Sequence, residues 1–217
     1  MTTENLHYPN IWARRADLIV HIIGLGLALF CGGMALGLAV SHGVVGKIAA
    51  TSIYAVGLIG MLSFSLAYNF ASEKFQPFLR RLDHAGIFLM IAASYTPFTT
   101  QALHGWWAIG MTSAIWTFAA LGILGKLFLP GLGKLIWVIL YLGLGWAAVI
   151  AIKPMSQGMP LAATILLAAG GLVYSIGTIF YMMKKLSFRR AIWHGHVVAA
   201  AAMHYAAIMV GVVVVAN

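Results

Sequence analysis

Four of the side chains able to do chemistry in this chain form two pairs at the ends of long apolar segments. Ser65 and Asn69 are four residues apart, as are Arg190 and His194. Residues at i and i+4 share one face of a helix, about 6 Å apart. Of these groups, the imidazole can bind a metal ion or transfer protons, and the guanidinium can form a salt bridge with a carboxylate.

More polar residues are expected at the same depth. Asp83 and His84 stand at the start of another apolar segment, and His21 lies one turn after Asp17 near the start of the first. Ionisable groups inside a membrane span are rare and usually face the interior of the helix bundle. We therefore expect Asp83 and His21 to join the two pairs in one polar site.

Each of these residues also has a structural explanation, which the sequence leaves open. Asp83 is suited to cap the helix that follows it. Asn69 can cap or join helices, and Ser65 can bond back to its own helix. His21 can be a packed residue between helices. Arg190 can be a loop cation whose head group extends to the interface.

The remaining histidines are not expected in this site. His196 lies about 200° around the helix from His194, and His204 lies about 15 Å deeper. Three more stand outside the apolar segments and are expected to contact water or lipid headgroups: His7, His42 and His104.

Composition indicates a membrane protein. Of 217 residues, 62% are apolar and 8% are charged, whereas soluble proteins have about a quarter charged. The net charge of +9 does not indicate nucleic-acid binding, because the basic residues fall in short segments between apolar runs. The single cysteine, Cys31, excludes a disulfide framework and a cysteine-cluster metal site.

We expect one domain over 1–217, an all-α integral membrane protein with seven transmembrane helices. A cytoplasmic N-terminal segment, 1–17, precedes the first. About 20 apolar residues cross a bilayer as a helix. The predicted spans are 18–40, 48–70, 84–103, 107–124, 135–152, 161–183 and 191–216.

The basic residues predict the orientation. Eleven of the 13 lysines and arginines fall on the side of the N-terminus, and Lys47 and Lys153 fall on the other. Lys and Arg favour cytoplasmic loops. This predicts a cytoplasmic N-terminus and a C-terminus outside.

Five segments carry a resemblance to a known family. They are "VHIIG" (20–24), "SLAYN" (65–69), "LDHAGIFLMIAASYTPF" (82–98), "GWAAVIAIKP" (145–154) and "LSFRRAIWH" (186–194). The chain resembles the hemolysin III proteins, which belong to the progestin and adipoQ receptor superfamily and are related to alkaline ceramidases. The resemblance implies seven helices with the N-terminus inside, and a bacterial inner (plasma) membrane.

The resemblance also implies a zinc site on spans 2, 3 and 7. Family members present S-x-x-x-H, an aspartate and H-x-x-x-H there, and three histidines hold the ion. Here the serine, the aspartate and the last histidine match Ser65, Asp83 and His194. Asn69 and Arg190 replace the other two histidines. His194 and Asp83 are the metal-ligand candidates that remain. His21 and His84 are candidates to substitute for the missing histidines, although their spacing does not reproduce the i, i+4 pair. Bound zinc is therefore possible, but no cofactor is expected.

A salt bridge explains both replacements together. We expect Arg190 to stand where the family keeps an ion and to pair with Asp83. A bidentate Arg–carboxylate pair neutralises a buried acid. Ser65 and Asn69 would surround the pair with hydrogen bonds.

Three functions fit the sequence. The first is a membrane protein that binds lipid or tunes membrane composition, with membrane lipid as its partner. The second is a zinc-dependent intramembrane hydrolase of a lipid amide, with Asp83 and Ser65 as catalytic residues. The third is a pore-forming cytolysin, although no ring of charges repeats between the spans.

Overall fold

The computed structural model describes residues 7–129 and 131–215, and these form a helical bundle. Six helical segments are long and apolar enough to cross a membrane. This confirms an all-helical membrane protein. The six are α1 (Ile11–Ser41), α2 (Val45–Phe70), α4 (Gly105–Phe128), the segment Lys134–Gly158, α7 (Leu161–Met182) and the segment Arg189–Val213.

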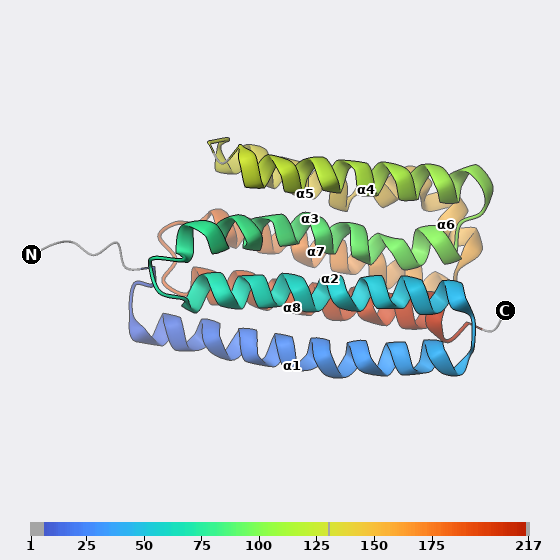
Figure 1. Cartoon of the computed structure of the whole chain (residues 1–217), viewed down its shortest axis with the longest axis horizontal. Coiled ribbons are helices and arrows are strands. Elements are labelled where there is room, and N and C mark those ends of the chain that lie inside the picture. Colours follow the sequence, from blue (N-terminus) through green and yellow to red (C-terminus); the bar gives the residue numbers. More distant parts are fainter. Residues whose placement is uncertain (1–6, 130, 216–217) are drawn as a thin grey trace, which may run out of the picture.

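Helix α3 (Gln76–Gln101) is the long helix that falls outside this set. Its first turns carry Arg80, Arg81 and Asp83, which lower its hydropathy. It nevertheless packs against both α2 and α4. In Figure 1 it runs beside them along the length of the bundle.

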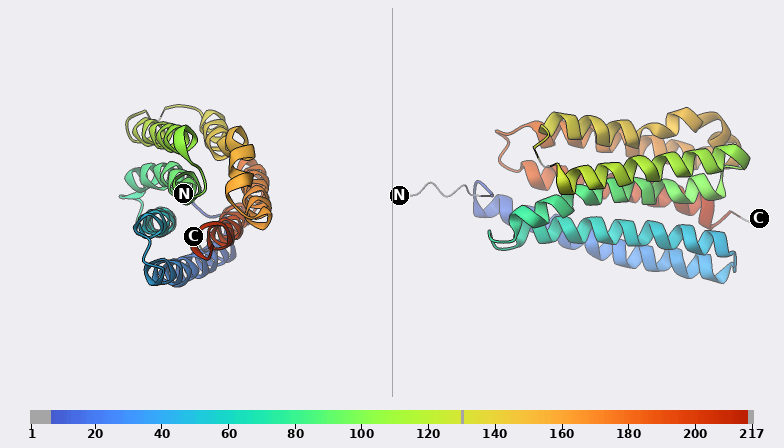
Figure 2. Two further views of the ribbon diagram at one scale, coloured as in Figure 1. Left: turned by 90° about the vertical axis from the view of Figure 1, so that its right-hand side faces the viewer. Right: turned by 45° about the horizontal axis from the view of Figure 1, so that its top comes forward.

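The helices surround the centre of the bundle. Each of α1 to α4 packs against the next, α7 packs against α8 (Arg189–Ile208), and α1 closes against α8. The end-on view in Figure 2 shows α8 between α1 and α7. The start of α8 is therefore brought beside the start of α1, although the two are far apart in sequence.

The helices extend beyond several predicted spans. Helix α1 begins at Ile11 and α3 at Gln76, whereas the sequence placed these starts at 18 and 84. Asp83 therefore lies inside α3, and the alternative that it caps this helix is wrong. The cap position is occupied by Phe75. Charged first turns hid these helix starts, because hydropathy detects the apolar part of a helix alone.

The predicted fifth span is interrupted. Helix α5 (Lys134–Gly145) is followed by a 3₁₀ segment, η1 (Ala147–Ala151), and by α6 (Ile152–Gly158). Tyr95 of α3 holds the interruption in place. Its hydroxyl donates to the Gly145 carbonyl and accepts from the Ala148 N–H, at 2.7 Å each. These bonds satisfy backbone groups that the helix leaves free.

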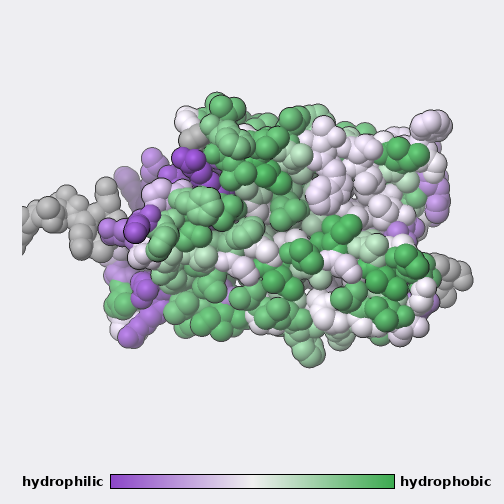
Figure 3. Space-filling view, viewed as in Figure 1, coloured by the Kyte–Doolittle hydropathy of each residue, from purple (hydrophilic) through white to green (hydrophobic). Residues whose placement is uncertain are grey.

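The last predicted span, 191–216, is also divided. Helix α8 is followed by η2 (Met209–Val213), a π-helical turn, and residue 216 lies outside the described residues. Figure 3 shows a mostly apolar side surface with hydrophilic residues gathered at the end where α1 begins. This is the arrangement of a bundle that places its side in lipid.

Candidate functional site

A cavity of about 440 Å³ opens between the helices near the end where α1 and α8 begin. All six residues singled out from the sequence line it: His21, Ser65, Asn69, Asp83, Arg190 and His194. They come from α1, α2, α3 and α8. Deeper in the bundle, the wall is largely apolar and includes Met90, Leu142, Trp146 and Val197.

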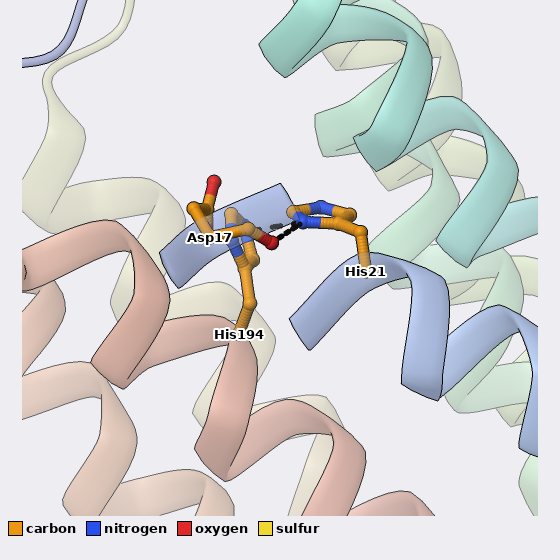
Figure 4. A group of neighbouring side chains, drawn as sticks. All are labelled: Asp17, His21 and His194. Carbon is orange, nitrogen blue, oxygen red and sulfur yellow. Dashed lines mark hydrogen bonds and ion pairs between the residues drawn. The ribbon is translucent and has the colours of Figure 1, made fainter. Parts of the chain in front are cut away.

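Asp17 is the centre of the polar cluster. Its Oδ1 lies 2.6 Å from Nδ1 of His194, and its backbone carbonyl oxygen lies 2.8 Å from Nδ1 of His21. Oδ2 accepts a 2.5 Å hydrogen bond from the Tyr8 hydroxyl. Asp17 is 0% exposed, so these partners replace the water that a buried carboxylate requires. Figure 4 shows Asp17, His21 and His194 meeting between α1 and α8.

Ser65 lies between the two histidines. Its Oγ is 3.1 Å from Nε2 of His21 and 3.4 Å from Nε2 of His194. Asn69, one turn later on α2, donates from Nδ2 to the Ser65 carbonyl at 2.9 Å and to Oγ at 3.4 Å. The i, i+4 spacing therefore brings Ser65 and Asn69 together, as their sequence positions predicted.

Arg190 binds a different partner from the one expected. Its Nη1 donates to Asn69 Oδ1 at 2.9 Å, its Nε to the His7 carbonyl at 3.2 Å, and its Nη2 to His7 Nδ1 at 3.2 Å. Among the described residues, the ion pairs are those of Asp17 with His21 and His194. The predicted Arg190–Asp83 salt bridge is therefore wrong, because the segment before α1 supplies other acceptors.

His7 is part of this cluster and does not simply face water or headgroups. A guanidinium can only donate, so Nδ1 of His7 accepts from Arg190 and Nε2 donates to Asn69 Oδ1 at 3.0 Å. Burial lowers the pKa of His7, and the positive charge of Arg190 lowers it further. Burial and the Asp17 carboxylate raise the pKa of the Tyr8 phenol. Both residues therefore remain neutral at pH 7.

Sequence reasoning missed the contact between Asp17 and His194. Asp17 itself could have been found, because it lies four residues before His21 on α1, and the sequence placed His21 in the site. The spacing does not indicate His194 as its partner. His196 and His204 lie away from the cluster. His196 bonds to the Ile192 carbonyl and packs on Phe180, and His204 packs against Tyr174.

Comparison with known proteins agrees with the sequence motifs. The family model described as "Haemolysin-III related" matches residues 14–205. The chain belongs to the hemolysin III family. It is 34% identical to the "Hemolysin-3 homolog" of Bacillus subtilis over 188 residues, which cover 86% of this chain and 88% of that relative.

This hemolysin III chain is also similar to a second bacterial protein and to a human protein. "Hemolysin-3" of Bacillus cereus is 34% identical over 191 residues, covering 88% of this chain and 87% of that relative. The human "Monocyte to macrophage differentiation factor" is 32% identical over 164 residues, covering 72% of this chain and 67% of that relative. These matches support an integral membrane protein.

The zinc site that the resemblance implies does not fit this chain. Asn69 and Arg190 stand at two ligand positions, and they bond to each other at 2.9 Å. A guanidinium has no lone pair to give a metal.

A different donor set is present. Asp17, His21 and His194 each offer a ligand atom, and these atoms lie within 4.8 Å of one another. This leaves zinc possible. An ion held by these three residues would supply Lewis acidity and an activated water.

Proposed function

We propose that this hemolysin III protein binds an anionic membrane lipid in its internal cavity. The observation that carries the proposal is the division of the cavity into a polar mouth and an apolar interior. Its volume of about 440 Å³ is in the range of ligand pockets, which are mostly apolar with a few convergent polar groups. An apolar lining favours an acyl chain over a column of water, and therefore lipid binding over a pore.

Charge favours an anionic headgroup. One carboxylate, Asp83, lines the cavity. Five basic side chains also line it: Arg80, Lys134, Lys184, Arg189 and Arg190. Of these, Arg190 has a planar guanidinium with five N–H donors, and three hydrogen bonds to His7 and Asn69 fix its position. A phosphate or carboxylate at the mouth would meet fixed positive charge.

A matched pair of substitutions on α5 tests the lipid site. Leu142 lines the cavity, whereas Leu140 is 45% exposed on the outside of the bundle. We expect Leu142→Trp to fill the cavity and reduce co-purified anionic lipid, measured by mass spectrometry, by about 10-fold or more. Leu140→Trp should retain it. Equal lipid content in the two variants would place bound lipid outside the cavity.

We further propose that the site is metal-poor. Both carboxylate oxygens of Asp17 already accept hydrogen bonds, from Tyr8 and His194, and the fixed charge of Arg190 opposes a dication in the same cavity. Elemental analysis should find less than about 0.2 zinc per chain. Asn69→His combined with Arg190→His should raise this value, because the pair restores two imidazole ligands. No increase would show that these positions do not face a metal site.

The topology completes the proposal. We infer that α3 is a seventh span in a single domain, with a cytoplasmic N-terminus, in a bacterial inner membrane. The length of α3, 26 residues, supports this, because about 20 helical residues cross the hydrocarbon layer. The side-by-side packing of α3 with α2 and α4 supports the same conclusion.

A further inference from the structure

Ser65 is the point where two imidazole rings meet. Nε2 of His21 and Nε2 of His194 lie 3.1 Å and 3.4 Å from its Oγ. Ser65 is 6% exposed and lines the cavity. A serine hydroxyl with a histidine nitrogen on each side has more proton acceptors than a structural serine requires.

The second nitrogen of each ring decides where its proton lies. Nδ1 of His194 faces the Asp17 carboxylate at 2.6 Å, and Nδ1 of His21 faces the Asp17 carbonyl oxygen at 2.8 Å. Both oxygens can only accept, so each neutral ring carries its proton on Nδ1. The lone pair of each Nε2 is then directed at Ser65.

We propose that Asp17, His194 and Ser65 form a catalytic triad that hydrolyses an ester or amide bond without a metal. Ser65 Oγ attacks the substrate carbonyl carbon, and His194 Nε2 takes the hydroxyl proton. The bond from the carbonyl carbon to the leaving alcohol or amine breaks, and the leaving group takes that proton from His194. Water then attacks the acyl-Ser65 ester, gives a proton to His194, and releases the acid. The proton returns to Ser65.

His194 is the base because of what holds its far nitrogen. The imidazolium that forms during attack is stabilised by the Asp17 carboxylate, which lies 2.6 Å from Nδ1 of His194. Nδ1 of His21 bonds to the neutral Asp17 carbonyl instead and lies 3.8 Å from the carboxylate. Asp17 is therefore a positioning residue for His194, and His21 is a positioning residue whose Nε2 lies 3.1 Å from Ser65 Oγ.

Charge that develops on the substrate oxygen has donors close by. Asn69 Nδ2 lies 3.4 Å from Ser65 Oγ, and Arg190 bonds to the oxygen of the same amide. Of the five N–H groups of the guanidinium, three are used by His7 and Asn69. Among the residues that the structure describes, the other two have no partner and can donate to an oxyanion at the mouth of the cavity.

The substrate class follows from the cavity and in this respect rests on the proposed lipid binding. The substrate is a lipid whose ester or amide carbonyl lies at the polar mouth and whose acyl chain occupies the apolar interior. The triad itself can be tested without any lipid, so failure of one proposal is distinguishable from failure of the other.

A fluorophosphonate probe tests the triad in the full-length protein in detergent. Its phosphorus forms a bond to an activated serine oxygen and releases fluoride. We expect peptide mass spectrometry to locate the adduct on Ser65, with labelling unchanged by a strong metal chelator. Labelling should fall by at least about 10-fold in Ser65→Ala, His194→Gln and Asp17→Asn. Two matched controls should label like wild type: Ser63→Ala on α2 and His196→Gln on α8.

A second measurement covers variants that fail to fold. In a Cys31→Ser background, Ser65→Cys places a thiol at the same position. We measure the ratio of its alkylation rate at about pH 6.5 to its alkylation rate at about pH 9. This ratio should be at least about 10-fold higher with His194 and Asp17 present than in proteins that also carry His194→Gln or Asp17→Asn. Three results would each overturn the triad. They are a folded wild-type chain without an adduct on Ser65, alkylation of the cysteine that is independent of His194, and labelling that the chelator abolishes.

Discussion

Arg190 holds the polar mouth together because it joins three parts of the chain. It lies on α8, it donates to Asn69 on α2, and it donates twice to His7 in the segment before α1. All three bonds involve a permanently charged donor, and such bonds are stronger than neutral ones. The guanidinium therefore ties the N-terminal segment to the bundle.

Replacing Arg190 with methionine should destabilise the folded protein. Methionine keeps much of the apolar length of the side chain but leaves Asn69 Oδ1 and two acceptors of His7 without this donor. The expected loss is about 1–3 kcal/mol of unfolding free energy. Unfolding in detergent at increasing temperature or denaturant measures it. Lys185→Met, at an exposed cation of the preceding loop, is the control and should change stability little.

Acid should weaken the same contacts. Because the pKa of His7 is lowered in the folded state, the unfolded chain takes up its proton first, near the ordinary value of about 6.5. The contribution of His7 is therefore fully present above about pH 6.5 and is lost as the pH falls toward the lowered folded value.

The measurement for His7 is a difference between two proteins. The apparent melting temperature should fall between about pH 7.5 and pH 5.5, and by less in His7→Gln, which does not titrate. An identical fall in both proteins would show that His7 is not the group responsible.

The sequence predicted which polar residues line the cavity better than it predicted how they pair. The i, i+4 spacing of Ser65 and Asn69 is a local property of one helix, so it was readable. The partner of Arg190 was not, because it depends on how the segment before α1 folds over the bundle. Asp17 was predicted to be the last residue before the first span, whereas α1 begins six residues before it, at Ile11, and buries it.

Close helix contacts explain why α2 and α3 pack so tightly. A Cβ added to Gly57 would lie 2.4 Å from Cβ of Ala93, whereas one added to Gly60 would meet nothing within 4 Å. Small residues let helix backbones approach in membranes, where packing drives association. Gly57 therefore sets the distance between α2, which carries Ser65, and α3, which carries Asp83.

Gly57→Ala should destabilise the protein, whereas Gly60→Ala should not. The first forces α2 and α3 apart and should cost about 1–3 kcal/mol. The second adds a helix-favouring methyl group in open space and should be neutral or stabilising by up to about 1 kcal/mol. Adding Ala93→Gly to Gly57→Ala should recover part of the loss. Equal behaviour of the two single variants would contradict this account of the contact.

The interruption after α5 shows that hydropathy predicts an apolar span but not a break within it. The segment 135–152 is apolar throughout, so it reads as one span. Its break is fixed by the Tyr95 hydroxyl on another helix, which bonds to Gly145 and Ala148. A tertiary contact of this kind cannot be predicted from the local sequence pattern, whereas the apolar segment itself can.

The distribution of charge makes the orientation of the whole bundle testable. The polar mouth lies at the end where α1 begins, and Figure 3 shows the hydrophilic residues gathered there. If α3 crosses the bilayer there are seven spans, and if it does not there are six. An odd and an even number place the later loops on opposite sides, so loop accessibility counts the spans.

Single cysteines in a Cys31→Ser background provide this count. Ser41, Ser156 and Lys185 are exposed, and each lies at or near an end of a helix. With seven spans and a cytoplasmic N-terminus, an impermeant maleimide added to intact cells of an expression host with the outer membrane removed should label Ser41→Cys and Ser156→Cys. The maleimide should label Lys185→Cys only after the cells are lysed. With six spans, Ser41→Cys would still be labelled in intact cells, because positive charge fixes the orientation of α1 and α2. Ser156→Cys would then be labelled only after lysis and Lys185→Cys in intact cells, because the loss of α3 as a span moves every later loop to the other side of the membrane.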